Sequence, residues 1–165
     1  MYNKVSKNRR AAPKGGQGFT LVELLVVIAI IVILFAVILV AIDPAKRIGQ
    51  SQDAVRTQDA RDILEAIQEY IADNDGALPS AITADSNYYE LGTCGSGASC
   101  TAQTVQSACV DLTGDLVDDY LAEIPMDPST GTSSGTDYYI KRDAGSNRIE
   151  VKACETYSGT IKTKR

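Results

Sequence analysis

An unbroken apolar run near the start of the chain restricts what this sequence can fold into more than any other feature. From Leu24 to Ile42 every residue is Ala, Val, Ile, Leu or Phe. A helix rises about 1.5 Å per residue, so a run of this length crosses the hydrocarbon core of a bilayer, which is about 30 Å thick. We therefore expect residues 19–42 to form a membrane-spanning helix.

A basic leader and a single carboxylate flank this run. Residues 1–18 contain no acid and five basic side chains: Lys4, Lys7, Arg9, Arg10 and Lys14. Glu23 stands at the beginning of the apolar segment, where a buried charge costs roughly 3 kcal/mol on insertion scales. Such a cost indicates that the Glu23 carboxylate has a partner.

The junction between the leader and the run carries a recognisable motif, Gly18-Phe19-Thr20-Leu21-Val22-Glu23. It resembles the class III signal of type IV pilins and pseudopilins, in which a basic leader ends in Gly and Phe-Thr-Leu-x-Glu begins an apolar helix. The resemblance implies that a prepilin peptidase cuts after Gly18 and methylates the new N-terminal Phe19. It also implies an assembly role for Glu23, which would be the fifth residue of the mature chain.

The chemistry of the cut end gives a reason for that role. Cleavage would expose an α-amino group, whose ordinary pKa is about 8, so the amine would be mostly cationic at neutral pH. A buried cation and a buried carboxylate are each unfavourable alone and become tolerable when paired. We therefore expect Glu23 of one subunit to meet the Phe19 amine of a neighbour and to set the register between them.

Two simpler interpretations of the N-terminal segment compete with this one. An ordinary secretory signal has an apolar core of about 7–15 residues followed by a small-residue cleavage site, whereas this run is longer and lacks such a site. A plain single-span anchor, with its basic side in the cytoplasm, fits the length and the charge. It leaves Glu23 and the Gly18-Phe19 junction unexplained, and it would make the protein a membrane-anchored extracytoplasmic binding domain.

Beyond the membrane segment the chain is predicted to form the second half of a spine helix, residues 43–75, and a globular head, residues 76–165. The proline of Asp43-Pro44 removes a helical hydrogen bond, so a bend or a short break is expected near residues 41–43. Apolar residues recur at helical spacing up to residue 71. Charged side chains are expected on the other faces of this helix, among them Asp53, Arg56 and Asp59.

The head is predicted to be a small antiparallel sheet of three or four strands packed on the outer half of the spine helix. Residues 137–142 and 148–154 have the composition of strands joined by a hairpin loop, and the second strand is expected to continue through residues 156–161. A short helix is expected at residues 113–122. The fold class is therefore α+β, as in type IV pilins.

Four cysteines lie beyond the membrane segment: Cys94, Cys100, Cys109 and Cys154. An even number in a translocated domain predicts two disulfides, for which three connectivities exist. We favour Cys94–Cys100 and Cys109–Cys154. A metal site is disfavoured because the chain has no His and no Cys-x-x-Cys pair.

A second segment carries a weaker resemblance, Ile124-Pro125-Met126-Asp127-Pro128-Ser129-Thr130-Gly131 followed by Tyr138-Tyr139. It is similar to the Pro-x-Asp-Pro…Gly…Tyr-x-Tyr segment of pseudopilins and of many Gram-positive-type pilins. Major pseudopilins of secretion systems bind calcium here, and Asp127, Ser133 and Asp137 could supply oxygen ligands. We favour a structural turn and keep structural calcium as the alternative; no other cofactor is expected.

Charge and composition narrow the class of function. The mature chain has 11 basic and 21 acidic side chains, a net −10, which argues against direct binding to nucleic acid. The sequence shows no nucleophile with a base and no phosphate-binding loop, so we expect no enzyme.

The sequence therefore predicts a structural subunit, a pilin, of a type IV pilus-like filament; the alternative is a pseudopilin of a type II secretion or competence system. Its implied partners are copies of itself, the prepilin peptidase, an assembly platform with its ATPase, and membrane lipid before assembly. It would wait in the cytoplasmic membrane with its N-terminus in the cytoplasm and its head outside, and then enter an extracellular pilus or a pseudopilus.

Overall fold

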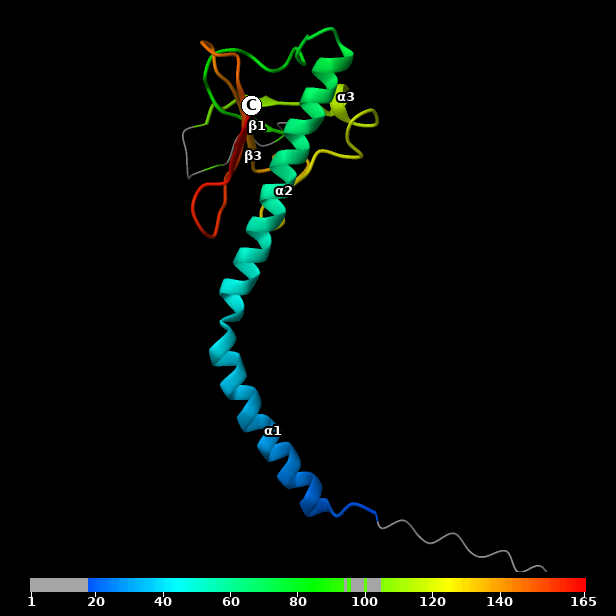
Figure 1. The fold of residues 1–165 in the computed structure, drawn as a ribbon, viewed down its shortest axis with the longest axis vertical. Coiled ribbons are helices and arrows are strands. Elements are labelled where there is room, and N and C mark those ends of the chain that lie inside the picture. Colours follow the sequence, from blue (N-terminus) through cyan, green and yellow to red (C-terminus); the bar gives the residue numbers. More distant parts are fainter. Residues whose placement is uncertain (1–17, 94, 96–99, 101–104) are drawn as a thin grey trace, which may run out of the picture. The chain divides into compact units, whose positions relative to one another are not determined.

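The computed structural model describes residues 18–93, 95, 100 and 105–165. The chain divides into two compact units, Met1–Asp43 and Pro44–Arg165. Among the described residues, the first unit contains one helix, and the second contains a long helix, a short helix and a sheet (Figure 1).

The helix of the first unit is α1, Leu21–Ile42, which begins two residues after the predicted start. None of its residues is buried. The helix ends at Asp43, whose backbone is left-handed with φ 47° and ψ 80°. A left-handed residue cannot continue a right-handed helix. The predicted break is therefore confirmed between Ile42 and Pro44.

Helix α2, Pro44–Asp73, begins the second unit. Its proline stands in the first turn, where the missing N–H would have no helical acceptor. The helix is closed at Gly76, whose N–H donates to the Ile71 carbonyl at 2.8 Å and whose φ is +86°. Glycine adopts that conformation without steric cost, and this is the usual way to close a helix.

The buried face of α2 changes character along its length. Its second half buries the predicted apolar stripe, including Ile63, Leu64 and Ile67. In its first half the same face continues at helical spacing as Gly49, Asp53, Arg56 and Ala60. The expectation that Asp53 and Arg56 lie on the other faces of the helix was wrong, because both are buried. The apolar Ile48 and Val55 are exposed instead, at 59% and 44%.

The head contains a five-stranded sheet, more than the three or four strands predicted. The strands are β1 (Tyr89–Leu91), β2 (Cys109–Val110), β3 (Tyr138–Arg142), β4 (Ile149–Ala153) and β5 (Lys162–Lys164). Their spatial order is β2-β1-β3-β4-β5. The β1–β2 pair is parallel and the other pairs are antiparallel. The predicted α+β class is confirmed, with α2 packed on the sheet.

Two local predictions in the head were wrong. The chain leaves β4 at Ala153 and turns at Gly159, with φ +79°, before it returns as β5, so residues 156–161 do not extend β4. Helix α3 is Thr113–Leu116, shorter than the predicted 113–122. Val117, the residue after the helix, is extended with φ −77° and ψ 144°, and Asp118 has φ +76°, so the helix does not continue.

The core lies between α2 and the inner face of β3 and β4. The inward residues of β3 and β4 include Tyr138, Ile140, Val151 and Ala153, each at most 4% exposed. The Tyr138 hydroxyl donates to the Asp59 carboxylate at 2.7 Å, so even the charged side of α2 contributes to this interface.

The disulfide connectivity differs from the favoured pairing. Cys100 is bonded to Cys154, which follows β4, with their Cα atoms 5.7 Å apart. Cys109 begins β2, and two strands lie between β2 and β4. Adjacent strands are spaced by about 4.8 Å, so three spacings exceed the roughly 7 Å that a disulfide can bridge. Both favoured bridges were therefore wrong: Cys109–Cys154 is excluded by topology, and Cys94–Cys100 is excluded because Cys100 is bonded to Cys154. Cys94 itself lies outside the described residues.

Candidate functional site

The predicted processing site lies immediately before α1, in extended chain. Gly18 and Phe19 have no regular secondary structure, and the Phe19 side chain is 92% exposed. Thr20 is the N-cap of the helix, with the β-region angles φ −79° and ψ 152°. No helix would therefore have to unwind for the predicted cleavage between Gly18 and Phe19.

Glu23 completes a reciprocal cap with Thr20. The Glu23 N–H donates to the Thr20 hydroxyl at 3.2 Å. In return, the Thr20 N–H and hydroxyl both donate to Glu23 Oε2, at 2.8 Å and 2.9 Å. This is a capping box, and its Thr-x-x-Glu signature is visible in the sequence, although the resemblance to pilins points only to an assembly role for Glu23. The carboxylate thus satisfies backbone groups of its own helix end.

The surface of α1 is apolar all round. Its Leu, Ile, Val and Phe side chains are 45–86% exposed in the isolated chain. By length and composition it is the one helix in the described part of the chain that could cross a membrane. Exposure of so much apolar surface to water is unfavourable, so we expect lipid or other helices to cover it.

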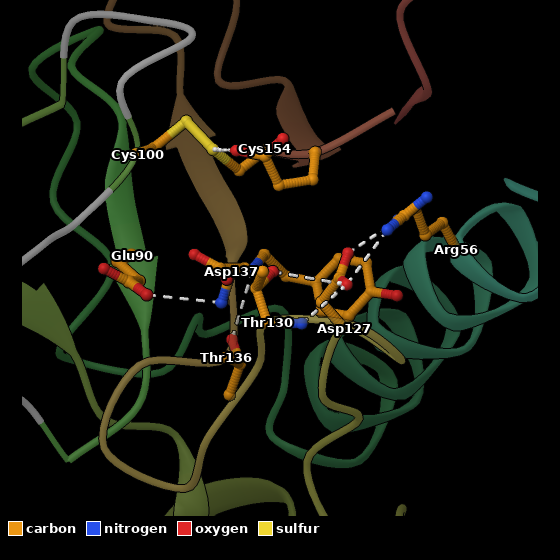
Figure 2. The surroundings of a disulfide bond; sticks show 10 residues. Arg56, Glu90, Cys100, Asp127, Thr130, Thr136, Asp137 and Cys154 are labelled. Carbon is orange, nitrogen blue, oxygen red and sulfur yellow. Dashed lines mark hydrogen bonds and ion pairs between the residues drawn. A yellow bond between two sulfur atoms is a disulfide. The ribbon is translucent and has the colours of Figure 1, made fainter. Parts of the chain in front are cut away.

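A second cluster of functional interest joins α2 to the head. Arg56 of α2 makes a two-bond contact with Asp127: Nε donates to Oδ2 at 2.6 Å and Nη2 to Oδ1 at 3.0 Å (Figure 2). Arg56 Nη2 also donates to the Ser129 hydroxyl at 2.8 Å. Arg56 and Asp127 are 3% and 4% exposed. Such planar, paired contacts are the strongest form of a charge-assisted hydrogen bond.

Asp53 extends this cluster to the loop after β4. It accepts from Arg56 Nη1 at 3.0 Å, and its two oxygens accept from the N–H groups of Tyr157 and Ser158, both at 2.9 Å. The Tyr157 ring lies on Gly49, where a Cβ atom would be 2.4 Å from the ring. The first half of α2 is therefore joined to the head by polar contacts and a close backbone approach.

The electrostatics of the cluster follow from this geometry. Burial alone would raise the pKa of the Asp127 carboxyl, but hydrogen bonds from Arg56 and Ser129 outweigh it and lower the pKa to about 2. Burial also raises the pKa of the Asp53 carboxyl, but hydrogen bonds from the Tyr157 and Ser158 N–H groups outweigh it and leave the pKa below its ordinary value. The hydrogen bond to Asp127 raises the pKa of Arg56. All three groups remain charged at neutral pH.

The predicted turn after Pro125 carries Asp127 to this cluster. The Asp127 carbonyl accepts from the Gly131 N–H at 3.1 Å, and a Cβ atom on Gly131 would lie 2.3 Å from the Asp127 nitrogen. Asp127 Oδ1 also accepts from the Ser129 N–H at 2.8 Å. Glycine is thus required at position 131 because the turn closes on itself there.

The three oxygen-bearing residues considered for calcium have separate contacts. Both Asp127 oxygens are engaged by Arg56, and the Ser133 carbonyl accepts from Thr93. The Asp137 N–H donates to Glu90 at 3.2 Å, on the side of the disulfide (Figure 2). Within the described residues, no group of three or more Asp, Glu, His or Cys side chains is gathered as a metal site. The cationic partner of the Asp127 carboxylate is therefore the Arg56 guanidinium.

Comparison with known proteins concerns the predicted processing site and α1. Residues 14–39 match the family model described as the prokaryotic N-terminal methylation motif. The chain thus carries the class III signal of type IV pilins and pseudopilins, and this supports a pilin-like or pseudopilin precursor. No curated protein and no solved structure matches the chain.

The match covers the end of the leader and most of α1. The motif implies processing by a prepilin peptidase and assembly into pilus-like filaments, and with α1 it indicates anchoring in a membrane. Pilins are structural subunits. The head lies outside the matched residues, so its contribution must be argued from its own geometry.

Proposed function

We propose that the mature chain, Phe19–Arg165, is a structural subunit of a type IV pilus-like filament. The observation that carries the proposal is the methylation motif at residues 14–39 placed directly on a fully exposed apolar helix. An anchor needs the helix but not the motif. A subunit that is cut, methylated and then bundled with its neighbours needs both.

Before assembly α1 holds the subunit in the membrane. The basic leader remains on the cytoplasmic side, as loops rich in Lys and Arg do. The head then lies on the opposite side of the membrane, and the Cys100–Cys154 disulfide is consistent with an oxidising space there. During assembly α1 exchanges lipid contacts for contacts with other α1 helices, driven by the assembly ATPase.

Glu23 has two tasks in this proposal. Its Oε2 accepts both capping bonds from Thr20, so Oε1 can accept from the Phe19 amine of a neighbouring subunit. A carboxylate offers about four lone-pair sites, so the cap and the intersubunit bond are compatible. The pair neutralises both charges inside an apolar bundle and sets the axial position of each subunit.

A second candidate within the same class is a pseudopilin of a secretion or competence system. The observation in its favour is the turn through Pro125, Asp127 and Gly131, which is the segment similar to that of pseudopilins. Long filaments recovered in quantity from the cell surface by shearing would support a pilin. Retention of the processed protein in the envelope, with no surface filament, would support a pseudopilin.

The intact mass of the protein from native membranes and from sheared surface material tests the proposal. We expect the mass of Phe19–Arg165 plus one methyl group. The mass of the full chain would show that the leader is retained, and it would favour a single-span anchored domain instead. A Gly18→Leu variant is the control, since a blocked cleavage site should yield only the full-length mass.

A further inference from the structure

Charge is unevenly distributed along the head. Residues 62–140 contain fourteen acidic side chains and no Lys or Arg. Residues 141–165 contain seven basic and three acidic side chains. An acidic head with net charge spread evenly would repel its copies in a filament from all sides. This chain instead separates the two signs, and the fold determines where each one is presented.

The sheet register gathers four lysines on one face, which we term the lysine face: Lys141, Lys152, Lys162 and Lys164. Glu150 of β4 stands opposite Lys141 of β3 and Lys164 of β5, and Lys152 stands opposite Lys162. Residues directly opposed in an antiparallel pair project to the same side of the sheet. The alternate residues of β4, Ile149 and Val151, are buried in the core with α2. The lysine face is therefore the side turned away from α2.

Tyr88 and Glu150 hold part of this face in place. The Tyr88 hydroxyl donates to Glu150 at 2.8 Å, and the Nζ atoms of Lys141 and Lys152 lie 4.8 Å and 4.2 Å from the centre of the Tyr88 ring. Lys152 Nζ is also 3.7 Å from the Glu150 carboxylate. The same side of the sheet also carries the buried Glu90, opposite Tyr139. Two carboxylates cannot neutralise four ammonium groups, so the face keeps a positive surplus. Lys162 and Lys164 on the outer strand are exposed.

The counterpart is an acidic lobe around α3, which consists of Asp73, Asp115, Asp118, Asp119 and Glu123. Asp73, at the end of α2, is tied to this lobe because the Tyr120 hydroxyl donates to it at 3.3 Å. Burial, followed by the negative charges of Asp73 and Asp119, raises the pKa of the Tyr120 hydroxyl. Asp118, Asp119 and Glu123 are exposed.

The outer strand of the lysine face and the acidic lobe lie toward opposite edges of the sheet. β5 forms one edge and β2, which leads into α3, forms the other. In Figure 1 the yellow segment around α3 and the red C-terminal strand lie on either side of α2. The lysine face of one head therefore cannot be neutralised by the acidic lobe of the same head.

We propose that the lysine face of one head docks on the acidic lobe of the next head in the filament. This inference rests on the proposed filament function, and it assigns to the heads an intersubunit contact separate from the bundling of α1. Two different, complementary surfaces on one molecule make a heterologous contact, which propagates as an open polymer when its rotation does not close a ring. Opposite charges also orient an incoming subunit and disfavour its reversed placement.

A second copy is favoured over a free polyanion because the chain itself supplies the counter-surface. Subunits held side by side by α1 present the acidic lobe at a high effective concentration, and weak surface ion pairs become sufficient there. A soluble anionic polymer would compete with that lobe and would also be repelled by the net −10 of the mature chain.

Charge reversal of the outer strand tests the docking. In the Lys162→Glu/Lys164→Glu variant we expect normal membrane insertion and the normal processed mass. Recovery of sheared filaments should fall by about tenfold or more, because like charges then face each other. Adding Asp119→Lys and Glu123→Lys should restore filaments. The matched control adds Glu65→Lys and Glu155→Lys, which give the same total charge outside the acidic lobe and should not restore them.

Each outcome separates this inference from the filament proposal. A wild-type chain that keeps its leader would refute the filament function and the docking with it. Processed wild-type filaments that are unaffected by the lysine reversal would overturn the docking alone. Restored filaments in the matched control would show that total charge, and not contact with the acidic lobe, governs filament yield, and this would overturn the docking. Unchanged filaments together with lost binding to inorganic polyphosphate would assign the lysine face to a polyanion instead.

Discussion

The two long helices of this protein differ in what they bury and what they expose. Helix α1 has no buried residue in the isolated chain, although it is apolar on every side. The first half of α2 buries Asp53 and Arg56 and leaves Ile48 and Val55 exposed. In each case the burial or exposure is unusual for the residue type, but the reasons differ. The apolar side chains of α1 have no packing partner within the described chain, whereas Asp53 and Arg56 have hydrogen-bond partners in the head.

The difference teaches which contacts the molecule makes alone and which it leaves for others. The head satisfies its buried charges internally, through a contact between residues 56 and 127 that spans 71 positions of sequence. Helix α1 can be satisfied only by lipid or by copies of itself. Variants in α1 should therefore change assembly and leave the fold of the head intact, while variants in the Arg56 cluster should do the reverse.

The largest effect is expected at Glu23. Glu23→Gln keeps a side chain that can cap the helix but removes the charge, and Glu23→Val removes both. We expect both variants to enter the membrane and both to lose filament yield by more than about 100-fold, since an unpaired buried charge costs about 3–5 kcal/mol. Sheared filament mass is the measurement. Normal fibres from Glu23→Gln would show that capping, and not the charge pair, is what assembly requires.

Removal of the Arg56 side chain should damage the head. Arg56→Ala leaves the Asp127 and Asp53 carboxylates buried without their cation, and we expect a loss of about 3–5 kcal/mol in the free energy of unfolding. The matched control is Arg61→Ala, on an exposed position of the same helix, which should change stability by less than about 0.5 kcal/mol. Denaturant unfolding of the mature chain in detergent would measure both. Equal stability of the two variants would contradict the role of Arg56 in joining α2 to the head.

Loss of the Cys100–Cys154 disulfide should have a somewhat smaller effect. The bridge closes a loop with a sequence separation of 54, for which the chain-entropy account gives about 4 kcal/mol and typical measured values are about 2–4 kcal/mol. Cys100→Ser, Cys154→Ser and the double variant should lose the same amount, because each breaks the same bond. Additive losses in the double variant would argue that the two cysteines are not bonded to each other.

Acid should weaken the head through Asp127. Its folded-state pKa of about 2 lies below the ordinary value of about 3.9, so its stabilisation is present at higher pH and is lost as the pH falls from about 4 to about 2. The contribution is about 2 kcal/mol. Asp127→Asn should flatten this part of the pH–stability curve, with Asp53 supplying the remainder. An acid limb that is identical in wild type and Asp127→Asn would exclude this assignment.

Features with a local cause are predictable from the sequence. The apolar run predicts α1, and Asp43-Pro44 predicts the break, because both depend on residues close in sequence. The hairpin of β3 and β4 is predictable for the same reason, since β4 alternates, β3 is rich in Tyr and Ile, and a short polar loop joins them. The methylation motif is also local, and its residues alone are enough to indicate the processing site.

Features that depend on distant partners are not predictable in this way. Arg56 and Asp127 follow no joint pattern, and each taken alone has the appearance of a solvent-exposed charge. Strands β1 and β2 are too short for an alternating pattern, and β5 has the composition of an exposed tail because two of its three residues are lysines. The disulfide connectivity requires the strand order, which no spacing of cysteines contains. The capping role of Glu23 differs from these, since Thr-x-x-Glu is a local signature.

The break at Asp43 also marks where the protein can be divided by hand. The compact unit Pro44–Arg165 keeps α2, the Arg56 cluster, the sheet and the Cys100–Cys154 bond in one piece. Removal of the preceding residues discards the only fully apolar surface among the described segments, so the remainder is suited to study in detergent-free solution.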